Sequence, residues 1–206
     1  MTRNIDAKCR LCRREGAKLF LKGERCYSPK CPIDKKGALP PGQHGQKRAG
    51  RLSDYGIRLR EKQKAKRIFD VTEKTFKNYY KKSSKFRGET GKRLLQLLET
   101  RLDNVLFKGG LLGSRTQARQ LICHGFCLVD GKRTNIPSYQ LAPGQIVTLN
   151  IKGMKLEPVK RSLAEKRVLP VWLKRKATVV KLDRLPEREE MEQDIDEQLI
   201  IEFYSK

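Results

Sequence analysis

The sequence has no long run of apolar residues. Its longest unbroken apolar stretch among 206 residues, Val168 to Leu173, has six residues, whereas a membrane-spanning helix needs about 20. The first ten residues, MTRNIDAKCR, also lack the apolar segment of a secretory signal. We therefore expect a soluble, cytosolic protein.

Residues suited to catalysis are equally scarce. The chain has two histidines, and it contains no glycine-rich loop of the Walker type that holds nucleotide phosphates. No motif for acid–base catalysis is present either. These absences argue against an enzyme.

Acidic residues are too few to balance the basic ones. The 23 Asp and Glu residues accompany 47 Lys and Arg residues, which gives a formal net charge of +24. Self-repulsion of this size destabilises a compact chain, and a polyanion relieves it while releasing condensed counterions. Residues 1–100 carry 28 basic and 10 acidic groups (+18), whereas residues 182–206 carry 3 and 9 (−6). We expect a nucleic-acid partner for the basic part, and protein or solvent around the acidic tail.

Four of the six cysteines have the spacing of a metal site. Cys9, Cys12, Cys26 and Cys31 form the pattern C-x2-C-x13-C-x4-C, and the long spacer fits a short hairpin that returns the chain to the metal. Zn²⁺ accepts four thiolates at about 2.3 Å in closed structural sites, so we predict one structural zinc ion. Two disulfides, which cytosolic conditions disfavour, or four unrelated thiols are the alternatives.

Helical patterns follow a stretch rich in proline and glycine, residues 32–50, which we expect to be an extended linker. A basic helix is expected after an N-cap at Ser53 or Asp54. A second helix should begin near Thr72 with its aromatic residues towards the core. A third should begin near Thr90 and continue to the glycines at 109 and 110.

A shorter helix is expected to begin at Ser114 and to bury its apolar residues. Arg115 and Arg119 are one turn apart, so we expect both guanidinium groups on one exposed surface suited to phosphate. Gly125 should cap this helix. We expect Cys123 on the helix and Cys127 on the next strand to be small buried side chains.

Residues 126–129 and 133–136, on either side of a turn at Asp130 and Gly131, are β-like, and clean alternation of apolar residues predicts a strand over 145–150. The segment from Arg101 to Leu149, RLDNVLFKGGLLGSRTQARQLICHGFCLVDGKRTNIPSYQLAPGQIVTL, resembles the αL-type RNA-binding domain known as the S4 domain. The upstream segment LSDYGIRLREKQKAKRIF, the cysteine pattern and the ending EQLIIEFYSK resemble the bacterial small-subunit ribosomal protein S4 family. The resemblance runs essentially end to end and indicates the four-cysteine branch.

The resemblance implies a non-enzymatic constituent of the small ribosomal subunit. It implies direct binding to the five-prime domain of ribosomal RNA at a helix junction, early in subunit assembly. It also implies neighbours that include ribosomal protein S5, and an influence on translational accuracy where messenger RNA enters the ribosome. The residues that we expect to contact RNA are Arg10, Arg13, Arg14, Arg25, Lys30, His44, Gln46, Lys47, Arg48, Tyr55, Arg58, Arg60, Lys62, Lys64, Lys66, Arg67, Ser114, Arg115, Arg119, Gln120, His124 and Lys132.

We expect an α+β fold in three parts. These are a zinc knuckle and extended linker over 1–45, a helical domain over 46–98 plus 188–206, and the RNA-binding domain over 99–187, with its core at 99–160 and a small, mostly antiparallel sheet. An RNA-modifying enzyme or synthetase carrying the same module is one alternative, although no catalytic domain is evident. A zinc-dependent DNA-binding regulator is another, although it lacks histidine ligands and a finger-type recognition helix.

Overall fold

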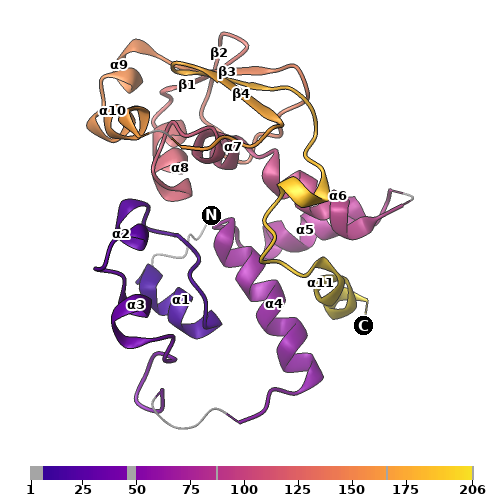
Figure 1. The fold of residues 1–206 in the computed structure, drawn as a ribbon. Coiled ribbons are helices and arrows are strands. Elements are labelled where there is room, and N and C mark those ends of the chain that lie inside the picture. The colour runs from indigo at the N-terminus through magenta and orange to yellow at the C-terminus, as the bar shows by residue number, and fades with distance from the viewer. Residues whose placement is uncertain (1–6, 46–49, 87, 166, 206) are drawn as a thin grey trace. The chain divides into compact units, whose positions relative to one another are not determined.

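The structure is a computed structural model that describes residues 7–45, 50–86, 88–165 and 167–205. The chain forms two compact units (Figure 1): a helical unit, Met1–Gly91 with Asp194–Lys206, and a sheet unit, Lys92–Gln193. Helices and antiparallel strands are both present, which confirms the predicted α+β class. Within the described ranges, every helix is too short or too polar to cross a bilayer.

Short helices form the N-terminal part of the helical unit: α1 (Lys8–Glu15), α2 (Glu24–Tyr27) and α3 (Pro32–Lys36). The prediction of a hairpin between the two cysteine pairs is wrong, because the described residues between α1 and α2 form turns and no strand. Helix α3 begins inside the stretch that was expected to be extended, because proline fits the first turn of a helix.

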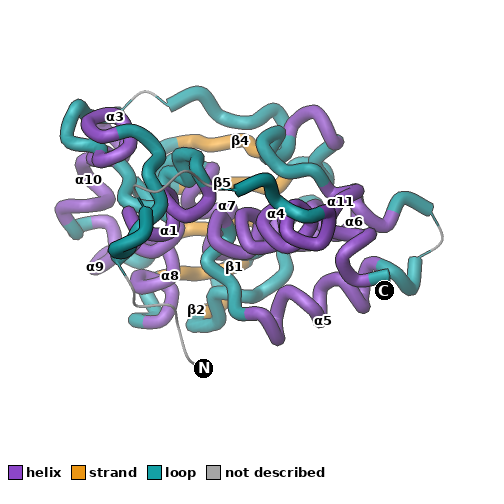
Figure 2. Tube along the Cα trace, turned by 90° about the horizontal axis from the view of Figure 1, so that it is seen from below, coloured by secondary structure: helices purple, strands orange, loops and turns teal. Residues whose placement is uncertain are grey.

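Longer helices complete this unit: α4 (Asp54–Ile68), α5 (Glu73–Ser83) and α11 (Glu197–Tyr204). The side-chain oxygens of Ser53 and Thr72 accept hydrogen bonds from backbone N–H groups in the first turns of α4 and α5, at 3.2 and 3.3 Å. Ser53 is therefore the N-cap of α4, one of the two predicted, and the helix predicted to begin near Thr72 does so. Helix α11 packs against α4, as Figure 2 shows. The first and last parts of the sequence therefore build one unit.

Aromatic rings join α5 to α11. Phe76 and Tyr79 are buried, which confirms their predicted place in the core. The half-buried ring of Tyr80 stacks on that of Tyr204 with centroids 4.7 Å apart, and the Phe76 and Tyr204 rings are 6.3 Å apart. These contacts fix the end of the chain to the unit.

The sheet unit holds most of α6 (Thr90–Glu99), together with α7 (Leu102–Lys108), α8 (Arg115–Cys123), α9 (Ile151–Met154), α10 (Glu157–Ala164) and a 3-10 turn, η1 (Arg188–Glu190). Its strands are β1 (Cys127–Val129), β2 (Lys132–Thr134), β3 (Ile146–Leu149), β4 (Leu173–Lys176) and β5 (Val179–Leu182). They form one antiparallel sheet in the order β2-β1-β3-β5-β4. Strands β1 to β3 match the predicted strands within a few residues, and β4 and β5 extend the sheet.

The continuous helix expected from Thr90 onward is wrong, because the chain leaves the helical conformation at Arg101. This residue is extended, with φ −65° and ψ 140°, and forms an antiparallel bridge with Gln140. The backbone N–H of Leu102 donates to the carbonyl of Tyr139 at 2.9 Å. Pairing with a distant loop therefore divides the apolar stripe between α6 and α7.

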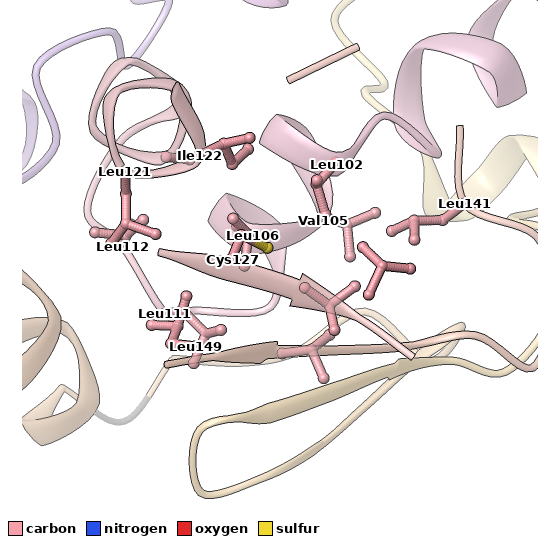
Figure 3. Packing of buried hydrophobic residues seen from close by; sticks show 14 of the residues in the cluster. Leu102, Val105, Leu106, Leu111, Leu112, Leu121, Ile122, Cys127, Leu141 and Leu149 are labelled. Atoms are coloured by element: carbon pink, nitrogen blue, oxygen red, sulfur yellow. The ribbon is translucent and has the colours of Figure 1, made fainter. Parts of the chain in front are cut away.

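The core of the sheet unit lies between α7, α8 and one face of the sheet (Figure 3). The side chains labelled there on the two helices and on β1 and β3 include Leu102, Val105, Leu106, Leu121, Ile122, Cys127 and Leu149. The predicted inward direction of the apolar residues of α8 is confirmed. This packing holds α8 in a fixed place on the sheet.

Cys123 and Cys127 lie in different surroundings. Cys127 is buried as predicted, and burial raises the pKa of its thiol to about 12. Cys123 is exposed, so its predicted burial is wrong; it lies on the side of α8 away from the core. Gly125 follows α8 with φ 71°, in the left-handed region, which explains glycine at the predicted cap.

Candidate nucleic-acid interface

Carboxylates of the helical unit itself neutralise the basic helix α4. Arg60 and Arg67 both pair with Glu15 at the end of α1, whose side chain is 1% exposed. Burial raises the pKa of Glu15, although the attraction of the two guanidinium groups opposes the rise. These ion pairs attach the N-terminal segment to α4.

Lys62 is the most enclosed of the α4 cations, with 4% of its surface exposed. Its ammonium group lies 2.9 Å from a carboxylate oxygen of Glu73 and 4.5 Å from the centroid of the Phe203 ring. The Tyr204 hydroxyl donates to the same carboxylate at 2.8 Å, and Lys66 pairs with it at 3.2 Å. Burial raises the pKa of Glu73, but these three hydrogen bonds outweigh it, so the net pKa lies below the ordinary value.

The remaining α4 cations are paired as well. Arg58 binds Glu202 of α11 at 2.7 Å. Lys64 pairs with Glu61 at 3.3 Å and also donates to the carbonyl of Asp194. All six cations among the predicted RNA contacts on α4 therefore have partners inside the helical unit. Apart from Glu61, these partners come from other segments of the chain, so the sequence around α4 did not show them.

Helix α5 carries basic residues that the sequence analysis missed. Lys74, Lys77 and Lys81 are exposed and share the side of α5 opposite Phe76 and Tyr79. In the part of the chain that the structure describes, no carboxylate pairs with these three ammonium groups. Their spacing, three and four residues apart, was the signal in the sequence.

The predicted RNA contacts in the N-terminal part of the chain lie in different surroundings. Arg13 is half-buried, and its guanidinium donates to the carbonyls of Leu39 at 2.7 Å and Pro40 at 3.1 Å, and so fixes the loop after α3. Gln46, Lys47 and Arg48 lie outside the described residues. The predicted contacts that are exposed in the helical unit are Arg10, Arg14, Arg25, Lys30, His44 and Tyr55.

Arg115 lies inside the sheet unit, so its predicted place on an exposed surface is wrong. It is 8% exposed, and its guanidinium donates to Asn104 at 2.7 Å and to Glu192 at 2.5 Å while lying 4.6 Å from the Phe107 ring centroid. Lys108 is 3.3 Å from the same Glu192 carboxylate. Burial raises the pKa of Glu192, but the two cations outweigh it and the net pKa is lowered. This part of the acidic tail therefore faces protein, as predicted.

The outer side of α8 keeps the other predicted contacts. Arg119 is half-buried, 3.8 Å from Asp103, whereas Gln120 and His124 are exposed. Ser114 is buried, and its hydroxyl oxygen caps α8 by accepting a hydrogen bond at 3.3 Å. Lys132 is exposed on β2, beside Arg133, which the sequence analysis missed and which lies over the end of α8. Exposed polar and basic groups thus gather at the C-terminal end of α8.

The four N-terminal cysteines, Cys9, Cys12, Cys26 and Cys31, lie close enough to influence one another. All are free thiols. Burial raises the pKa of Cys12, and repulsion from the other three sulfurs raises it further. The backbone N–H of Lys22 points to the sulfur of Cys26 at 3.3 Å, a contact that stabilises a thiolate. Within the described residues no such group is arranged tightly enough to hold an ion as it stands, but the chemistry of the donor set fits Zn²⁺.

Comparison with known proteins covers both units. Residues 3–99 match the model of the ribosomal protein S4/S9 N-terminal domain, and residues 100–147 match that of the S4 domain. The two matches are contiguous and leave the segment after residue 147, which contains β4 and β5, outside them. Together they span well over half of the chain.

Individual relatives match along the entire length. The chain is 54% identical to "Small ribosomal subunit protein uS4" of Thermodesulfovibrio yellowstonii, 52% to that of Dictyoglomus turgidum and 49% to that of Thermus thermophilus. Each alignment covers 100% of both chains. This chain belongs to the ribosomal protein S4 family.

Proposed function

We propose that this protein is a structural, RNA-binding constituent of the small ribosomal subunit, located in the cytoplasm on the ribosome. It binds the five-prime domain of ribosomal RNA directly at a helix junction, promotes subunit assembly, and contributes to translational accuracy near the point where messenger RNA enters. Ribosomal protein S5 is among its neighbours. Relatives named as ribosomal proteins match the whole chain, which removes the support for an RNA-modifying enzyme or synthetase.

The main support for the proposal is the position of the basic side chains that have no carboxylate partner in the described part of the chain. The α4 cations already have carboxylate partners inside the helical unit, so they are less available to phosphate than unpaired cations are. The exposed lysines of α5, the exposed arginines of the N-terminal segment and the cations beside α8 have charge available for a partner. Several separate basic surfaces suit a partner that presents phosphates from several directions, as a folded RNA junction does.

This arrangement explains how such a protein can stabilise folded RNA without catalysing a reaction. Cations spread over different faces neutralise phosphates of different RNA helices, which would otherwise repel one another. Within each unit, the packed core behind α5 or behind α8 keeps the cations of that unit in place. The protein therefore favours the RNA shape whose phosphates match its surfaces.

Salt-dependent binding tests the proposal. The full chain should bind a transcript of the five-prime domain with an affinity that falls steeply as KCl rises. Changing Lys74, Lys77 and Lys81 together to glutamine should reduce the slope of log affinity against log salt by about 2–3, close to 0.9 per lost phosphate contact. Changing Lys174, which pairs with Asp183 at 2.8 Å, is the matched control and should alter the slope little. A transcript that binds equally at low and high salt would contradict the proposal.

We also propose that Cys9, Cys12, Cys26 and Cys31 hold one structural Zn²⁺ ion. Bound zinc supplies four bonds that close the N-terminal segment into a knuckle, and the nearby arginines balance the negative charge of the thiolates. Metal analysis of freshly purified protein should find one zinc per chain, and the C26S variant should lose it. Zinc-free wild-type protein would refute this assignment.

A further inference from the structure

Two aromatic rings stack at the surface of the N-terminal segment. Tyr27, the last residue of α2, is 68% exposed. Its ring lies against that of Phe20, with centroids 5.0 Å apart and ring planes inclined by 25°. One face of the tyrosine is thus supported by protein, while most of the side chain remains accessible.

The support for this ring is rigid. Phe20 has φ 50°, in the left-handed region that bulky residues rarely adopt, and such a conformation persists only where its surroundings impose it. Leu19 and Leu21 on either side of it are buried and supply that constraint. Tyr27 is therefore held on a fixed base.

Three exposed cations lie close to Tyr27 in the sequence. Arg25 lies two residues before Tyr27 in α2, and Lys30 lies three residues after it; both are exposed. Lys22 is exposed as well, and its backbone N–H bonds to the sulfur of Cys26, the neighbour of Tyr27. No carboxylate partner for these three side chains occurs in the described part of the chain.

We propose that the exposed face of Tyr27 is a stacking site for one unpaired RNA base, whose flanking phosphates bind Lys22, Arg25 and Lys30. This inference rests on the proposed RNA-binding function and extends it to single-stranded nucleotides. An aromatic face beside several cations is the arrangement that binds single strands without reading their sequence. A protein partner fits less well, because the apolar neighbours Leu19 and Leu21 are buried and leave no apolar patch around the ring.

The test uses the zinc-loaded full chain and a ten-nucleotide oligoadenylate with 2-aminopurine at its centre. The wild type should bind the oligonucleotide and quench the 2-aminopurine fluorescence, because the fluorescent base stacks on Tyr27. Tyr27→Ala should bind it about 5- to 150-fold more weakly, the range measured for loss of one base–aromatic stack, and should abolish the quenching. Tyr27→Phe should stay within about twofold of the wild type, since it keeps the ring.

Two controls separate stacking from other causes. Affinity for a blunt-ended, fully paired RNA duplex should be the same in all three proteins. Equal zinc content and equal far-ultraviolet circular dichroism should show that all three have the same fold. Equal oligoadenylate affinity and quenching in wild type and Tyr27→Ala would overturn the stacking site and would point to a protein contact at this ring. This holds even when binding of the five-prime domain is intact and depends on salt. Failure of the wild type to bind the five-prime domain would instead overturn the proposed function.

Discussion

Replacing Lys62 by methionine separates a structural role of α4 from an RNA-binding one. The change removes an ion pair with half-exposed Glu73, worth about 1 kcal/mol or less, and the cation–π contact with Phe203, worth about 0.5–2 kcal/mol. Methionine keeps the apolar stem, and Glu73 keeps Lys66 and Tyr204 as partners. We expect a net loss of about 1–2 kcal/mol in the free energy of unfolding, or roughly 3–6 °C in melting temperature.

Urea denaturation of the full chain, followed by helical circular dichroism, measures this loss as a lower midpoint at unchanged slope. The matched control is Lys77→Met on α5. Its free energy of unfolding should stay within about 0.5 kcal/mol of the wild type, but its binding of the five-prime domain should be weaker. The reasoning is refuted when Lys62→Met leaves the midpoint unchanged and weakens RNA binding as Lys77→Met does, since Lys62 would then be a phosphate contact.

Other changes follow from single contacts. Arg115→Ala should cost about 2–4 kcal/mol, because it leaves buried hydrogen-bonding partners unsatisfied; a urea midpoint equal to the wild type would contradict the buried network. Glu73→Gln should lower stability at neutral pH, since the folded-state pKa of Glu73 lies below its ordinary value of 4.5. That deficit should disappear as the pH falls below 4.5 and through the folded-state pKa, so acid titration of both proteins should give converging stabilities. Cys127→Ser should cost about 1–3 kcal/mol and Cys123→Ser about 0.5 or less, because only the first is buried; thermal melts yielding the reverse order would be inconsistent with this. Gly125→Ala should cost about 1 kcal/mol, measured by urea denaturation, because φ is 71°, which strains a residue with a Cβ.

The sequence predicted helix starts and strands correctly where the residues that determine them are neighbours in the chain. Ser53, Thr72 and Ser114 each cap the helix that follows, because their side chains bond within the next turn. The first two strands after α8 were predicted from β-like residues on either side of a turn, and the third from alternation after another turn. In each case the physical cause lies within a few residues of its effect.

The wrong predictions all concern features that depend on residues far apart in the chain. The break between α6 and α7 depends on bonds from Arg101 and Leu102 to a distant loop. The cations of α4 appeared available because their partners, such as Glu15 and Glu202, come from other helices. Arg115 was misplaced for the same reason, since Glu192 comes from the acidic tail. A cation's role cannot be read from a sequence until its counter-ion is located.

The order in which a ribosome makes this chain has a consequence for folding. The helical unit needs both Met1–Gly91 and α11, which comes from the last residues. Synthesis at roughly 5–20 residues per second delays α11 by about 5–20 s after α5, while the sheet unit is produced. During that interval Lys62 lacks the ring of Phe203, and Arg58 lacks Glu202. A nascent chain therefore presents a more strongly cationic α4 than the finished protein does.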